Sequence, residues 1–156
     1  MKGPAMTHGV EAGRFTIGVF QDVTWAERGI GALKGAGFPP ESLTIVALDS
    51  PGVAALMEQA FGAAGERLDL PGIGVALARG PLVEALDDAE LKRQGLGGAL
   101  RRAGFQQHDG RIFERLIARG GVLVAVRSEP AAAEALALLH SYGGGNAAIG
   151  AWSGRV

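Results

Sequence analysis

The sequence predicts an α+β domain in which two related β-α-β units form a ferredoxin-like mixed sheet, with helices inserted between the units. A pattern of buried strand, amphipathic helix and terminal glycine occurs twice, 106 residues apart. It runs from Thr16 to Gly37 and again from Val122 to Gly143. Each copy is followed by a second strand-like run, as expected of a duplicated structural unit.

The chain has 156 residues, which fits one domain, since single domains most often span about 100 to 150 residues and some are larger. Residues 1–14 lack apolar periodicity and are expected to form a flexible tail. The single domain at 15–156 then divides into a first β-α-β unit at 15–48, a central segment at 49–121 and a second β-α-β unit at 122–152.

The first unit opens with a strand at 15–20, where β-branched and aromatic residues are typical of a strand covered on both faces. A capping box from Thr24 to Glu27 predicts the start of the next helix. Gly37 predicts its end, because glycine adopts the left-handed conformation that terminates helices. A second strand is predicted at 43–48.

The central segment begins with a helix that Ser50 caps and Gly65 ends. A short strand is predicted at 73–78, because glycine and proline bracket a run of alternating apolar residues. A helical stretch follows at 82–103, with a break expected near Asp87.

A further helix is predicted from Asp109, as its capping residue, to Arg119. The second repeat then supplies a strand at 122–126, a helix at about 130–142 and a final strand at 147–152. This last strand completes the second β-α-β unit.

The composition excludes several classes of protein. The chain has no cysteine, which rules out thiol catalysis, zinc ribbons, iron–sulfur ligation and disulfide frameworks. A formal net charge of −1 provides no field for attracting nucleic acid. The longest uncharged stretch, at 135–154, is interrupted by polar residues and three glycines, so no integral membrane span is expected. Because no secretory signal is evident either, the predicted location is cytoplasmic.

Two glycine-rich segments suggest ligand binding. Gly29, Gly31 and Gly35 resemble a dinucleotide fingerprint, but they fall within the predicted helix instead of between a strand and a helix. We therefore interpret them as allowing a helix to pack closely on the sheet.

The second glycine-rich segment lies between two prolines. Gly72, Gly74 and the nearby Arg79 are compatible with a backbone cradle for a small ligand. They are also compatible with a strand that needs glycine where another element approaches, and we favour this structural interpretation.

The catalytic candidates are Asp22, Asp49 and His108. Asp22 and Asp49 each follow a strand of the first unit, so parallel strands would place both carboxylates at one edge of the sheet for acid–base chemistry. Both positions also suit turns and helix starts. None of the three histidines has a second ligand at the spacing of a helical metal pair, so neither a metal nor a cofactor is predicted.

Arg111, Arg115 and Arg119 recur every four residues and therefore form one stripe on a helix. Guanidinium groups bind phosphate and carboxylate well, which suggests an anion or an acidic partner. A solvated helix face explains the same pattern, and we favour that explanation.

Several segments together resemble the bacterial general stress protein family that includes heat-induced stress proteins. The resemblance covers residues 15–143 and is carried mainly by glycine and apolar positions. The matching positions are 17–20, 26–27, 33, 35–38, 70–74, 78–82, 98–100, 103–105 and 119–124. The resemblance implies a stress-associated, non-catalytic α/β domain, and it brings no catalytic residues to this chain.

The sequence thus favours a non-enzymatic binding or structural module, linked to stress, that self-associates as a homodimer through exposed sheet edges. One alternative is a small enzyme whose site lies at the strand ends. Another is a module that binds an anion or an acidic partner through the arginine stripe.

Overall fold

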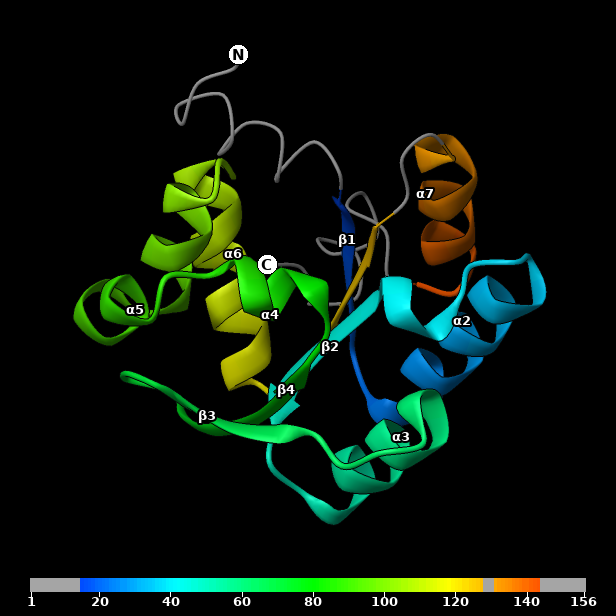
Figure 1. Cartoon of the computed structure of the whole chain (residues 1–156), viewed down its shortest axis with the longest axis horizontal. Helices are drawn as coiled ribbons and strands as arrows, with labels where there is room; N and C mark the ends of the chain where they lie inside the picture. The colour runs from blue at the N-terminus through cyan, green and yellow to red at the C-terminus, as the bar shows by residue number, and fades with distance from the viewer. Residues whose placement is uncertain (1–14, 128–130, 144–156) are drawn as a thin grey trace.

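A computed structural model describes residues 15–127 and 131–143 of the protein. It contains a five-stranded sheet with the order β1-β5-β2-β4-β3, and helices cover both faces of it (Figure 1). The strands are β1 (Phe15–Phe20), β2 (Leu43–Leu48), β3 (Glu66–Leu70), β4 (Gly74–Arg79) and β5 (Val122–Arg127). The helices are α2 (Val23–Gly35), η1 (Pro40–Ser42), α3 (Pro51–Phe61), α4 (Pro81–Ala85), α5 (Asp88–Arg102), α6 (Gln107–Ala118) and α7 (Ala132–Ser141).

The sheet confirms the predicted α+β class. All four strand pairs that the structure describes are antiparallel, so the described sheet is not mixed as predicted. The reason is that β5 lies between β1 and β2, which run in the same direction without touching. This is a split β-α-β unit, with β1, α2 and β2 as its parts. The predicted final strand at 147–152 lies outside the described residues.

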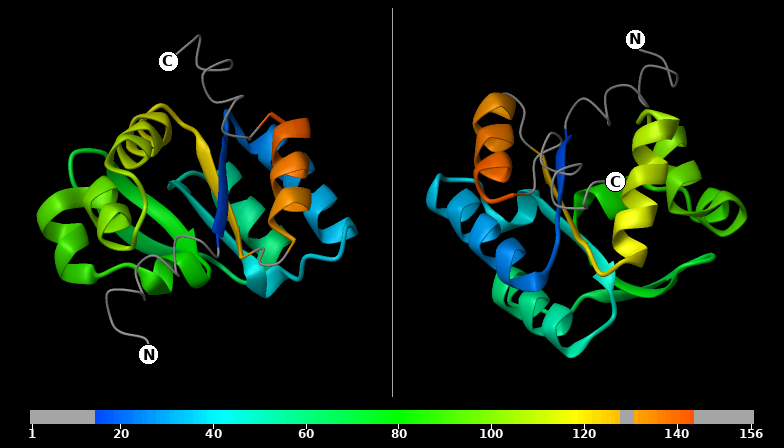
Figure 2. Two further views of the ribbon diagram at one scale, coloured as in Figure 1. Left: turned by 90° about the horizontal axis from the view of Figure 1, so that it is seen from above. Right: turned by 180° about the vertical axis from the view of Figure 1, so that it is seen from behind.

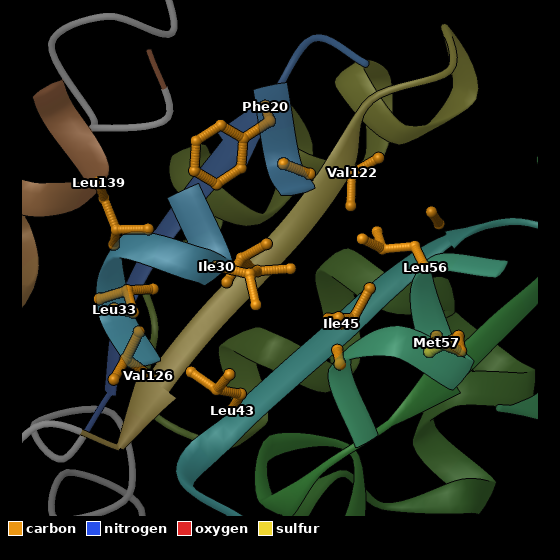
Figure 3. Close-up of a cluster of buried hydrophobic side chains, with 14 of the residues drawn as sticks. Phe20, Ile30, Leu33, Leu43, Ile45, Leu56, Met57, Val122, Val126 and Leu139 are labelled. Carbon is orange, nitrogen blue, oxygen red and sulfur yellow. The ribbon is translucent and has the colours of Figure 1, made fainter. Parts of the chain in front are cut away.

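Helices α2, α3 and α7 cover one face of the sheet, and α4, α5 and α6 cover the other (Figure 2). Alternate residues of β5 point to the two sides, so that Leu123 packs with α5 and α6 while Val124 packs with α2 and α3. Figure 3 shows part of the core between the sheet and helices α2, α3 and α7, where Leu33 of α2 and Met57 of α3 approach the sheet. Burial on both faces explains the almost continuous apolar run of β5.

The N-cap of α2 lies two residues before Thr24, the N-cap that the capping box predicted. The Asp22 carboxylate accepts a hydrogen bond from the backbone N–H of Trp25 at 2.9 Å, so Asp22 is the N-cap and Thr24 is not. Within the helix, Gly29 lies against the ring of Phe20, and a Cβ at this glycine would overlap the ring. Gly29 therefore allows close packing on the sheet, whereas Gly31 faces open space.

The central segment contains a hairpin of which the sequence predicted only the second strand. Helix α3 ends at Gly62, which has a left-handed φ of 70°, and not at Gly65. Strand β3 then pairs with β4, and Pro71 and Gly72 form the turn between them. In this turn the N–H of Ile73 donates to the carbonyl of Leu70 at 2.9 Å, and Gly72 has a φ of 77°, as expected of a type II turn.

The predicted helical break near Asp87 is confirmed. The Asp87 carboxylate accepts from the N–H of Glu90 at 3.0 Å and caps α5. Helix α6 begins at Gln107, two residues before the predicted cap. Asp109 is thus a residue of the first turn, where its negative charge interacts favourably with the helix dipole.

Helix α5 bends at Gly95, which has non-helical angles within it. Beyond this bend α5 crosses α6 at two glycines, since a Cβ on Gly110 would lie 3.0 Å from the carbonyl oxygen of Gly97. With 15 residues, α5 is the longest helix in the described part of the chain. None of the helices within 15–127 and 131–143 is long and apolar enough to cross a membrane.

Candidate ligand cleft

The two aspartates predicted as catalytic candidates lie at the same end of the sheet, because β1 and β2 run in the same direction. However, β5 separates these strands. Asp22 caps α2, and Asp49 forms an exposed ion pair in which its Oδ2 lies 3.2 Å from Nη1 of Arg67. Asp22 therefore caps a helix, and Asp49 pairs with a residue of β3.

His108 lies near the opposite end of the sheet. It is in the first turn of α6, while the end of α6 leads into Val122, which pairs with Phe20 next to the Asp22 turn. A helix of 12 residues spans about 18 Å at 1.5 Å per residue, so His108 is far from both aspartates. The three catalytic candidates do not form one site. Among the described residues there is also no group of three or more His, Cys, Asp or Glu side chains that could hold a metal.

Charged side chains converge instead on an open cleft of about 570 Å³ at the other end of the central strands. We call it the Arg79–Arg127 cleft. Its charged residues come from five different elements, namely η1, β3, β4, α4 and β5. They are Glu41, Glu66, Arg79, Glu84 and Arg127.

These five charged side chains are exposed and form no ion pair with one another. The guanidinium of Arg79 lies 5.9 Å from the ring centroid of Phe61, and its Nη1 donates to the carbonyl of Ala64 at 3.4 Å. The guanidinium of Arg127 lies 5.4 Å from the ring centroid of Phe15. Aromatic faces thus hold both cations, and their remaining N–H groups are available to a ligand.

The rim formed by α4 is fastened to β2. Gly80 has a φ of 129°, and its backbone comes so close to the carbonyl of Leu43 that a side chain would not fit. Two residues later, the N–H of Leu82 donates to Oγ1 of Thr44 at 2.9 Å. These contacts fix the position of α4, so that Glu84 and Leu43 line the same cleft.

The glycine segment proposed as a cradle is split by the structure. Gly72 lies in the β3–β4 turn and Gly74 is the first residue of β4, whereas Arg79 is the last residue of β4. A strand of six residues spans roughly 17 to 20 Å, so the glycines do not join the cleft to which Arg79 contributes. Arg79 is the one charged cleft residue that the sequence singled out. Glu41, Glu66, Glu84 and Arg127 were missed, because a lone charge at the end of an element carries no signal in sequence.

The arginine stripe lies on the outer side of α6. Arg111 and Arg115 are exposed opposite the buried Phe113 and Leu116, and Arg119 is the residue that caps the helix. In the described part of the chain, none of these three guanidiniums forms an ion pair. The stripe is a separate surface from the Arg79–Arg127 cleft.

A second hollow, of about 370 Å³, lies along β1 between α6 and α7. We call it the β1 groove. Its lining is mainly apolar, and Leu136 of α7 is 42% exposed within it. The other large apolar side chains of the groove are Phe15, Ile17, Phe105 and Phe113.

The fold and the cleft define an α+β protein with a helical layer on each face of its sheet and an open, charged cleft at one sheet end. Comparison of the chain with models of known families, with curated proteins and with solved structures finds no match.

Proposed function

We propose that the protein is a non-enzymatic binding module that holds a small zwitterionic ligand in the Arg79–Arg127 cleft. One observation carries this proposal. Carboxylates and guanidiniums from five elements line the same cleft, and none of them neutralises another. Side chains with mutually unpaired charges of both signs are complementary to a molecule that carries both an amine and a carboxylate.

The two arginines suit the anionic end of such a ligand, because a guanidinium donates two parallel hydrogen bonds to a carboxylate. The three glutamates suit the cationic end. Leu43, Phe61 and Val83 add an apolar surface between them. Since the cleft is open to solvent, salt is expected to screen these contacts and weaken binding.

The proposal is tested by titrating the full chain with free lysine, glutamate and alanine while backbone amide shifts are recorded by NMR. A variant with Arg79→Gln and Arg127→Gln, and another with Glu66→Gln and Glu84→Gln, should each lose the shift changes around the cleft. The matched control with Arg111→Gln and Arg115→Gln removes two charges elsewhere and should retain them.

Two results would overturn the proposal. One is that none of the three amino acids shifts any amide at the cleft. The other is that the cleft variants bind as well as the control variant does.

A second candidate function is binding of an anion or an acidic partner through Arg111, Arg115 and Arg119. It is favoured by their exposure and by the lack of ion pairs to them within the described residues. Changing all three to glutamate should then abolish retention of the protein on an immobilised polyanion such as heparin. Unchanged retention would exclude this role.

We further propose that the protein acts in the cytoplasm as a homodimer and is linked to stress. The support is the lack of cysteine, the sheet edges and the family resemblance of its glycine and apolar segments. Sedimentation equilibrium tests the dimer, and a monomer across the micromolar range would contradict it. Measuring the level of the protein before and after heat shock tests the link to stress.

A further inference from the structure

In the part of the chain that the structure describes, no strand pairs with the outer edge of β3. This strand is the last of the sheet and pairs only with β4 (Figure 1). Its sequence is Glu-Arg-Leu-Asp-Leu, in which Arg67 and Asp69 are exposed and Leu68 is half-buried. An open edge strand offers a row of backbone N–H and C=O groups to another chain.

The outward-pointing backbone groups of β3 belong to Arg67 and Asp69. In an antiparallel pair, opposite residues turn their N–H and C=O groups either toward each other or away from each other, in alternation along the strands. The carbonyl of Val75 accepts from the N–H of Asp49 at 3.0 Å, so Val75 faces β2 and turns away from β3. Val75 lies opposite Asp69, and Leu77 lies opposite Arg67. Both residues of β3 therefore direct their backbone groups to the open edge.

Two copies of β3 match opposite charges when they pair antiparallel around a two-fold axis at Leu68. Arg67 of each copy then lies opposite Asp69 of the other. Because both residues have outward backbone groups, each of these pairs exchanges both of its N–H···O bonds. Leu68 lies opposite its own copy as the non-hydrogen-bonded pair between them, where side chains approach most closely.

The neighbouring two-fold registers that use the same outward groups are unfavourable. An axis at Arg67 places two guanidiniums opposite each other, and an axis at Asp69 does the same with two carboxylates. Like charges directly opposite each other destabilise a strand pair, whereas opposite charges stabilise it. The axis at Asp69 also brings Pro71, which has no N–H to donate, opposite Arg67. The charges of β3 thus favour the register centred on Leu68.

Arg67 can make the contact to a second copy without leaving its partner in its own chain. Its Nη1 lies 3.2 Å from Oδ2 of Asp49, while its side chain stays 71% exposed. A guanidinium has five N–H donors in a planar fork, so it can donate to two carboxylates at once. Asp69, in contrast, forms no ion pair with any described residue. A second copy supplies the cation that this carboxylate lacks.

We propose that the protein forms its homodimer through β3, as an antiparallel strand pair centred on Leu68 that joins the two sheets into one. This inference rests on the homodimer proposed above and gives it a surface and a register. Charged residues at a sheet edge deter pairing with unrelated strands. In β3 the same charges have signs that fit a second copy of the chain.

Charge reversal tests this register in solution. Arg67→Asp places carboxylates opposite each other, and Asp69→Arg does the same with guanidiniums, so each variant alone should dimerise at least about tenfold more weakly than the wild type. An equimolar mixture of the two variants restores opposite charges at both pairs and should form heterodimers. Sedimentation equilibrium of the full chains measures the association. Arg115→Asp, the matched control, reverses an exposed charge on α6 and should dimerise as the wild type does.

The outcomes separate this inference from the homodimer itself. Weak association of each variant alone, with recovery in the mixture, supports the β3 contact. Equal dimerisation of all the variants would show that another surface forms the dimer, and would overturn the β3 contact alone. Weak association that mixing does not restore would overturn the register. A wild type that is monomeric across the micromolar range would overturn both the contact and the homodimer.

An engineered disulfide gives a second test, because the chain has no cysteine of its own. Opposite residues of a non-hydrogen-bonded pair have Cα atoms about 4.5 Å apart, which a disulfide spans, so Leu68→Cys should yield covalent dimers on mild oxidation. The matched control is Glu66→Cys in the same strand. Its two copies are offset by about 14 Å along the strands, beyond the reach of a disulfide. No covalent dimer from Leu68→Cys, or an equal yield from both variants, would overturn the proposal.

Discussion

The backbone N–H of Leu82 donates a hydrogen bond to the hydroxyl oxygen of Thr44 at 2.9 Å, and the side chain of each residue is almost fully buried. The bond joins the first turn of α4 to the middle of the sheet. Thr44 is one of the few buried polar residues in the described core, and its hydroxyl is used to hold a helix. The same helix carries Glu84 on the rim of the Arg79–Arg127 cleft.

Thr44→Val should therefore destabilise the protein by about 1 to 3 kcal/mol, because it keeps the shape of the side chain but leaves a buried N–H without an acceptor. Urea unfolding measures this loss. Thr44→Ser is the matched control. Because it retains the hydroxyl, the amide NMR signal of Leu82 should keep its native chemical shift. A valine variant as stable as the wild type would show that the bond contributes little.

Gly29 and Gly31 should respond in opposite ways to alanine. At Gly29 the new methyl group meets the buried ring of Phe20, and overpacking of this kind costs about 1 to 3 kcal/mol. At Gly31 the methyl group enters open space on the same helix, where replacing glycine gains about 0.5 to 1 kcal/mol. Thermal unfolding measures the stability of both variants. An equal loss of stability at the two positions would contradict the close packing of Gly29 on Phe20.

The elements that the sequence predicted well are those whose signals are local. The apolar run of β1 and the cap at Ser50 each predicted a feature found within a residue or two. Strand β3 was missed because three of its five residues are charged, namely Glu66, Arg67 and Asp69, and because it is an edge strand that pairs only with β4 in the described sheet. Asp22 and Thr24 are both good capping residues, so sequence alone did not choose the first.

The candidate site was less predictable because it depends on strand order. Insertion of β5 between β1 and β2 pairs residues that are 77 to 112 positions apart and separates Asp22 from Asp49. The same insertion brings Arg127 to the cleft beside residues of the central segment. No local pattern around Arg127 indicates this placement, since its neighbours arise from the pairing of whole strands.

Asp49→Asn should change stability by less than about 1 kcal/mol, because the side chain of its partner, Arg67, is 71% exposed and surface ion pairs contribute little. A double-mutant cycle with Arg67→Gln, measured in low and high salt, isolates the interaction energy between Asp49 and Arg67. Its coupling energy should fall as salt is added. A loss of several kcal/mol for Asp49→Asn alone would point to a further role for this carboxylate.

Asp87 should make stability depend on pH in the acidic range. The hydrogen bond from the Glu90 N–H is the main cause that lowers the pKa of the Asp87 carboxyl below its ordinary value of 3.8, and Arg102 and Arg93 add smaller effects. Because the folded-state pKa is the lower one, the folded protein binds the proton less readily than the unfolded chain. The stabilisation is therefore complete above the unfolded value and is lost as pH falls through the folded value.

Asp87→Asn tests this assignment, since an amide oxygen still accepts from the Glu90 N–H but the side chain no longer titrates. The difference in unfolding free energy between wild type and variant should be constant above about pH 5 and should shift toward the variant below pH 3.8. Urea unfolding of both proteins between neutral and acidic pH measures it. The contributions of the other carboxylates are common to both proteins and cancel in the difference. If the difference stayed constant over the whole pH range, the protonated and the ionised carboxyl of Asp87 would accept the Glu90 N–H hydrogen bond equally well. That result would contradict the assignment of Asp87 as a charged N-cap of α5.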